Sequence, residues 1–206
     1  NEAYKKIAGK TINVSWTDFM GNDRDVRYRV PNVNQCKECH AAKDKITPIG
    51  PKARNLNKNF DFKEGEFNQL TYWMNKQIID DYPMELVSPV DWTDEDENIN
   101  DRVRSYLDVN CGHCHSPTGN ANSTGLYLHL DETRKIHLGL YKKPVATGRG
   151  SGGLKYSIVP GKPDESILLH RMISLDPGVM MPESGRALSH IEAVEMVREW
   201  IMVMED

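Results

Sequence analysis

Apolar and polar positions alternate near the start of the chain and recur at helical spacing later. The alternating stretches cover residues 11–16 and 26–30, with turn-forming residues at 20–23 between them. This pattern predicts a short β-hairpin. The first helical pattern follows at residues 66–79, where apolar side chains lie about one turn apart. It predicts an amphipathic helix in that segment.

Three more helices are predicted in the second half. An acidic run at residues 91–97 precedes apolar positions at 103–107, and carboxylates favour the positive end of a helix dipole. A proline followed by two acidic residues opens the pattern at 163–172, where a proline is tolerated in the first turn. Ser189 and Glu192 have the spacing of a capping box, which predicts the start of a final helix.

Composition narrows the classes of protein that fit. The 206 residues allow one or two domains. No stretch approaches the ~18 consecutive apolar residues of a transmembrane helix, so none is predicted. With 26 basic against 30 acidic residues there is no excess of positive charge, which argues against nucleic acid as a partner. Only 8% of residues are aromatic, and a large apolar cofactor would help to fill two interiors.

The four cysteines form two CxxC pairs, and a histidine follows each pair directly. The segments read CKECH at 36–40 and CGHCH at 111–115. This spacing is typical of c-type haem attachment, in which both thiols bond to the porphyrin and the imidazole binds the iron. The sequence therefore predicts two covalent haem c groups, held by Cys36, Cys39, Cys111 and Cys114, with His40 and His115 as iron ligands.

Two other uses of paired cysteines fit less well. Zinc ribbons place their CxxC pairs about 15–20 residues apart. Here 71 residues separate Cys39 from Cys111. Disulfides within each pair would not require a following histidine. If no haem is bound, a zinc site or disulfides remain the alternative uses of the four cysteines.

Several segments resemble the diheme c-type cytochromes of bacterial periplasms. The helix at 102–110 runs directly into CGHCH, and YSIVPG follows at 156–161. Further on come Arg171-Met172, Met181-Pro182 and the final helix. The resemblance covers residues 98–204 well and residues 31–90 less well.

The resemblance implies a mainly α fold with two helical domains like class I cytochrome c, each around a covalent haem. A short N-terminal β-hairpin would precede them. Residues 1–90 would form the hairpin and the first haem domain, and residues 91–206 the second. Haem c attachment in this family implies export to the bacterial periplasm. The abrupt start at Asn1 then suggests a processed or trimmed end, with upstream sequence missing.

The resemblance also indicates distal iron ligands. Met181 lies 66 residues after His115, as the class I methionine ligand does, with Met180 as the alternative. Met84 lies 44 residues after His40 and is the candidate for the first haem. Met74, a histidine, a lysine or an open position remain possible there. His113, inside the second motif, is expected to face solvent.

These features favour an electron carrier over an enzyme. Two six-coordinate haems would pass single electrons between periplasmic redox proteins in transient encounters. The alternative is a diheme peroxidase or oxidase, or the electron-entry module of a longer enzyme, with one open distal site. Such an enzyme needs an acid or base above the iron, and no local sequence pattern announces one.

Overall fold

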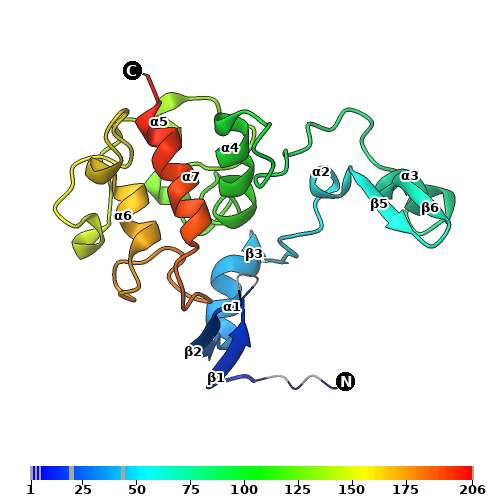
Figure 1. Cartoon of the computed structure of the whole chain (residues 1–206), viewed down its shortest axis with the longest axis horizontal. Coiled ribbons are helices and arrows are strands. Elements are labelled where there is room, and N and C mark those ends of the chain that lie inside the picture. The colour runs from blue at the N-terminus through cyan, green and yellow to red at the C-terminus, as the bar shows by residue number, and fades with distance from the viewer. Residues whose placement is uncertain (1, 3, 5, 19–20, 43–44, 206) are drawn as a thin grey trace.

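The computed structural model describes all residues except 1, 3, 5, 19–20, 43–44 and 206 (Figure 1). The N-terminal part combines short strands and helices, and its three sheets are two-stranded hairpins. In chain order its elements are β1 (Lys10–Thr17), β2 (Asp23–Val30), α1 (Val33–His40), β3 (Ala41–Ala42), β4 (Lys45–Ile46), α2 (Ala53–Leu56), β5 (Asn59–Phe62), β6 (Gly65–Asn68) and α3 (Gln69–Asn75).

The C-terminal part is built from helices and ordered loops. Its elements are α4 (Ile99–Asn110), α5 (Lys135–Leu138), α6 (Ile167–Ile173) and α7 (Ile191–Met202), with short 3₁₀ helices at Asn122–Thr124, Gly148–Ser151 and Pro163–Glu165. In Figure 1, α4, α6 and α7 lie together in one body, while β1–β2 and β5–β6–α3 project from it. No helix in the described ranges has both the length and the apolar composition of a membrane span.

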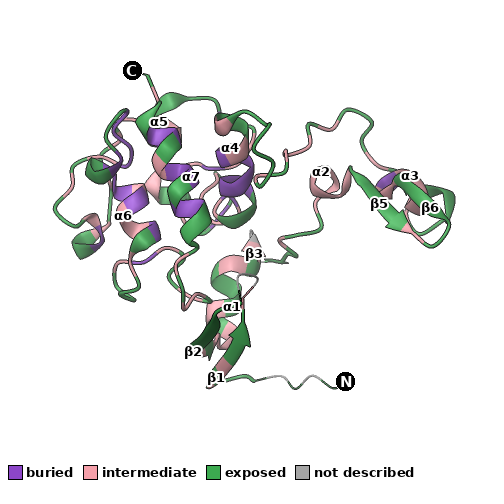
Figure 2. Cartoon of the chain, in the orientation of Figure 1, coloured by how far each residue is buried: buried purple, intermediate pink, exposed green. Residues whose placement is uncertain are grey.

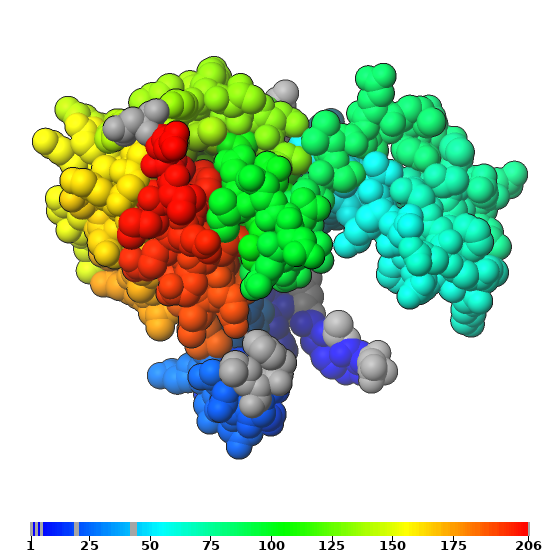
Figure 3. All heavy atoms as spheres, turned by 45° about the horizontal axis from the view of Figure 1, so that its top comes forward, coloured from blue at the N-terminus to red at the C-terminus, as the bar shows by residue number. Residues whose placement is uncertain are grey.

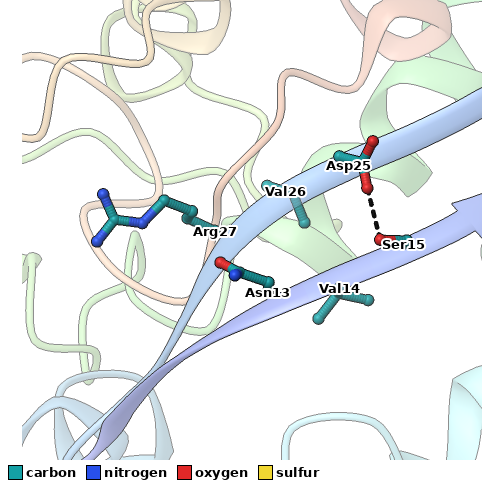
Figure 4. Close-up of a pocket in the computed structure, with 6 residues that line it drawn as sticks. All are labelled: Asn13, Val14, Ser15, Asp25, Val26 and Arg27. Atoms are coloured by element: carbon teal, nitrogen blue, oxygen red, sulfur yellow. Dashed lines mark hydrogen bonds between the residues drawn. The ribbon is translucent and has the colours of Figure 1, made fainter.

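The predicted N-terminal hairpin is confirmed. Strands β1 and β2 are antiparallel, with Val14 opposite Val26 and Ser15 opposite Asp25. Figure 4 shows the Ser15 hydroxyl donating to the Asp25 carboxylate, at 2.5 Å. Residue 20 of the predicted turn lies outside the described residues.

The helix predicted at residues 66–79 is wrong in its first part. Residues 65–68 form β6, which pairs with β5 so that Phe60 lies opposite Phe67. The side chain of Asn68 then caps α3, accepting from the backbone N–H groups of Leu70 and Thr71 at 3.1 Å. An asparagine in this position ends the strand and starts the helix, because its side chain satisfies donors that the helix leaves free.

The buried core lies almost entirely in the C-terminal part. Among the described residues before α4, only Leu70 is buried. Figure 2 shows the buried positions concentrated on α4, α6 and α7. The inward faces of α4 and α7 meet through the fully buried side chains of Val103, Leu107, Val197 and Ile201. Burial of such side chains is the main stabilising term in folding.

These observations correct the predicted fold class. The chain is 32% helical and 16% strand, a mixed α and β protein, where a mainly α protein was expected. The prediction of two cytochrome c-like helical domains is wrong. The described residues of the N-terminal part form hairpins and short helices and bury one residue, so they build no helical core.

The predicted final helix is present as α7, but its predicted cap is wrong. Val194, Val197 and Ile201 are buried on one face of α7, as the apolar spacing indicates. The helix begins at Ile191 and has no side-chain cap. The Ser189 hydroxyl donates instead to the carbonyl of Met172, at 3.2 Å. The Ser189 hydroxyl, which the local pattern predicts as the cap of the final helix, is therefore bonded to α6 instead.

An ion-pair cluster attaches α2 to the C-terminal part. The side chain of Asp108, on α4, is fully buried. It accepts from the guanidinium of Arg54 at 2.5 Å and from the backbone N–H of Leu130 at 2.9 Å. The Lys52 ammonium lies 3.7 Å away, and Arg54 also pairs with Asp131 at 2.9 Å. In the space-filling view of Figure 3, residues around 50–60 lie against the C-terminal part.

Candidate functional site

The CGHCH segment follows α4 without a break. The N–H of Cys111 donates to the carbonyl of Leu107 at 2.8 Å, which continues the last turn of the helix. The N–H of His115 then donates to the carbonyl of Cys111 at 2.9 Å. A β-carbon at Gly112 would lie 2.8 Å from the carbonyl oxygen of Asp108, so this position has little room for a side chain. Local geometry therefore fixes both thiols and the imidazole relative to α4.

A cavity of about 360 Å³ opens beside this segment. The lining includes Cys111, Cys114 and His115 from the CGHCH segment. It also includes Met181 from the loop after α6. The volume falls within the roughly 300–1,000 Å³ typical of small-molecule and cofactor sites. Its apolar lining includes Leu126, Leu128, Val145, Ile167, Leu168 and Met172. Met180, the alternative ligand, is buried and lies outside this lining.

Burial shifts the pKa of two groups that line the cavity. It lowers the pKa of His115 to about 4, so the imidazole is neutral at neutral pH. Burial also raises the pKa of the Cys111 thiol to about 12. A neutral imidazole is the form that binds a metal.

Two arginines hold the loop that carries Met181. Arg171 donates to the carbonyl of Val179 at 2.8 Å, and its own carbonyl accepts from the N–H of Met181 at 3.0 Å. Arg186 donates to the carbonyls of Met181 at 2.7 Å and Met172 at 2.8 Å. The thioether of Met181 is thus carried by a backbone that is fixed from both sides.

The first motif lies on α1, outside this cavity except for its C-terminal end. Asn32 and Gln35 form a reciprocal capping box that starts the helix. Cys36 and His40 are exposed, and the Nδ1 atom of His40 lies 3.4 Å from the carbonyl of Thr47. Cys39 lines the cavity of the second motif.

The two methionines considered for the first haem are not buried. Met84 is 82% exposed, in the segment between α3 and α4, and Met74 is 36% exposed on α3. Neither packs into the core of the C-terminal part. Both assignments stay predictions.

The end of α1 contacts the second motif directly. The Asn120 amide donates to the carbonyls of Glu38 and Lys37, and the Cys114 thiol lies 3.5 Å from the Glu38 carbonyl. The Ser184 hydroxyl donates to the Glu38 carboxylate at 3.3 Å. Through these contacts the end of the first motif, at Glu38 and Cys39, lines part of the cavity.

Cys39, His113 and Cys114 meet at this contact. One ligand atom from each lies within 4.8 Å of the other two. The expectation that His113 faces solvent is wrong, because the residue is half-buried and its Nδ1 atom is enclosed without a hydrogen-bond partner among the described residues. Hydrogen bonds from Cys114 and His113 lower the pKa of Cys39 to about 4, while the same contact with Cys39 raises the pKa of Cys114.

Sequence reasoning missed several residues of the site. Met172 ends the apolar pattern predicted at 163–172, yet it also lines the cavity. Arg171 and Arg186 act on the Met181 loop through backbone carbonyls, which leave no sequence pattern. Glu38 and Asn120 join segments that are 82 residues apart, and only the fold brings them together.

The donor set combines two thiols, an imidazole and a thioether around one cavity. Such sulfur and nitrogen ligands suit haem iron, copper and zinc. Comparison of the chain with protein-family models, curated proteins and solved structures finds no match.

Proposed function

We propose that the chain is a c-type cytochrome that carries single electrons. Haem c would be attached at Cys111 and Cys114, with His115 and Met181 as its iron ligands. The observation that carries this proposal is the cavity, which both thiols, the imidazole and Met181 line together. The residues fit the group, because the walls are largely apolar, the two thiols can link to the porphyrin, and the imidazole and thioether are iron ligands that haem c uses.

Each residue has a distinct task in this proposal. The two thiols would bond to the porphyrin, and neutral His115 would offer a lone pair to the iron. Haem iron held by histidine and methionine changes oxidation state by one electron. Arg171 and Arg186 hold the Met181 loop through its backbone carbonyls, and this would limit rearrangement of the loop when the iron changes charge. The apolar walls exclude water from the cavity.

We further propose a second haem c at Cys36 and Cys39, with His40 as its iron ligand. This part depends on the CKECH motif alone, and Met84 stays a predicted distal ligand. Location in a bacterial periplasm and brief contacts with periplasmic redox proteins belong to the same proposal, because haem c attachment implies them.

Haem counting on variants tests the attachment sites. We expect two haems per chain by pyridine haemochrome assay of protein made with haem c maturation. The double variant Cys111→Ser/Cys114→Ser should retain one haem, and Cys36→Ser/Cys39→Ser should also retain one. A count that stays at two in the first variant would contradict haem attachment in the cavity.

Replacement of Arg186 tests its role as a positioning residue. In Arg186→Gln the carbonyls of Met181 and Met172 lose their shared donor, so the loop should hold the thioether less firmly. We expect the haem count to be unchanged while the weak red absorption band of the methionine–iron bond decreases and carbon monoxide binding increases.

Arg198→Gln is the matched control. Arg198 pairs with Asp164 on the surface, where the carboxylate is 81% exposed. Its replacement should leave both spectroscopic signals unchanged. Equal loss of the red band in the two variants would rule out a specific role for Arg186.

A further inference from the structure

The contact between the two motifs joins one cysteine from each. Cys39 comes from CKECH, whereas His113 and Cys114 come from CGHCH, and their ligand atoms lie within 4.8 Å of one another. Within the described residues this is the only cluster of three or more histidine, cysteine or carboxylate ligand groups at such spacing. Neither motif forms such a cluster by itself.

The surroundings hold this cluster together. Asn120 and Ser184 donate to the backbone and side chain of Glu38, next to Cys39 in the chain. The second motif is fixed in turn by the last turn of α4. All three ligand residues are half-buried, and the enclosed Nδ1 atom of His113 has no partner in the described part of the chain.

The ligand set decides which metal suits the site. Two cysteines and one histidine are borderline-soft ligands that favour Zn²⁺, and three protein ligands leave a fourth tetrahedral position for water. Carboxylate-binding cations such as Mg²⁺ and Ca²⁺ would find no oxygen ligand in this set.

We propose that the haem-free chain binds one Zn²⁺ ion through Cys39, His113 and Cys114, across the two motifs. Zinc–sulfur bonds form to Cys39 and Cys114 and a zinc–nitrogen bond forms to His113, each in place of a water ligand of the aqueous ion. Cys39 binds as the thiolate, the Cys114 thiol releases its proton to solvent, and no electron is exchanged. If the proposed function holds, zinc and haem compete for one thiol of each motif. Zinc binding would then delay haem attachment at both sites.

The experiment uses the full chain made without haem maturation and kept reduced. Zinc affinity is measured by competition with a chromophoric chelator, and Co²⁺ substitution reports tetrahedral thiolate coordination by absorption. We expect one ion per chain. Cys39→Ser, Cys114→Ser and His113→Asn should each weaken binding by about 100-fold or more, since loss of even an outer partner of a metal ligand typically costs 10–100-fold.

Cys36→Ser and Cys111→Ser are the matched controls, because each removes a cysteine of the same motifs outside the cluster. Both should bind zinc as the unchanged chain does. Binding through the pairs within each motif would make all four cysteine variants weaker, and this result would overturn the proposal. Absence of zinc binding would also overturn it.

The haem count of matured protein separates this inference from the proposed function. Two haems in matured protein together with no zinc binding by the haem-free chain would overturn the zinc site alone. Zinc binding with the expected variant pattern, together with no haem after maturation, would support the zinc site and overturn the proposed function.

Discussion

Met181→Ala is expected to keep its haem attached and to lower the potential of that haem. The covalent bonds to Cys111 and Cys114 do not involve the thioether, so the haem count should not change. Methionine stabilises ferrous iron, and its loss should shift the potential downward by on the order of 100 mV, within the roughly 0.8 V range that axial ligands cover. Carbon monoxide should then bind to the reduced iron. A spectroelectrochemical titration measures the shift.

Met180→Ala is the control for this prediction. Met180 is the neighbouring residue and is buried, but it does not line the cavity. Its replacement should leave both potentials in place while removing a similar side-chain volume. A drop in potential in Met180→Ala, with none in Met181→Ala, would assign the ligand to Met180. Unchanged potentials in both variants would exclude either methionine as the ligand.

Arg54→Ala should destabilise the protein by about 3 kcal/mol. The Asp108 side chain is fully buried, and removal of the guanidinium leaves its charge with Lys52 at 3.7 Å and one backbone N–H. Loss of one partner from a buried ion pair typically costs about 3–5 kcal/mol, because the other charge stays buried. Denaturant unfolding of the wild type and the variant measures the difference in the free energy of unfolding.

Two variants test whether the buried charge is the cause. Lys162→Ala breaks a pair with Glu165 in which both side chains are about 60% exposed, and it should change stability by less than about 1 kcal/mol. Asp108→Asn combined with Arg54→Ala removes the isolated charge and should recover part of the loss. The single variant Asp108→Asn is measured as well. If the double variant loses as much stability as the two single variants together, this explanation is contradicted.

Local patterns predicted those elements whose partners are close in sequence. The hairpin of β1 and β2 follows from alternation on both sides of a turn. The stripe of Val194, Val197 and Ile201 on α7 follows from helical spacing. The CxxCH spacing also marked Cys39, Cys111, Cys114 and His115, which line the cavity, because covalent attachment chemistry requires a fixed local order.

The wrong predictions concern residues that bond to a partner outside the local sequence pattern. Phe67 is spaced from Leu70 as in a helix, but residues 65–68 pair as a strand with the segment that carries Phe60 and Phe62 at alternating positions. That alternation, next to Gly65 with its φ of 127°, was a signal for a hairpin. At α7, Ser189 binds the carbonyl of Met172, a partner that no local pattern reveals.

The core of the N-terminal part was also overestimated from the sequence. Its motif and its helical stretches resembled a haem domain, yet its described residues bury only Leu70. Aromatic side chains there stack on one another near the surface, as Phe62 and Tyr72 do with ring centroids 3.7 Å apart. One attachment to the C-terminal part is the ion pair of Arg54 and Asp108, which are 54 residues apart in sequence.

Absorption spectroscopy of the purified, matured protein tests the central claim most directly. Oxidised and reduced spectra, a pyridine haemochrome count and carbon monoxide added to the reduced sample are recorded together. The account predicts two thioether-linked haems per chain, with no carbon monoxide response from the haem at Cys111 and Cys114. A protein that carries no covalent haem would contradict the account and return the two CxxC pairs to zinc or disulfide chemistry.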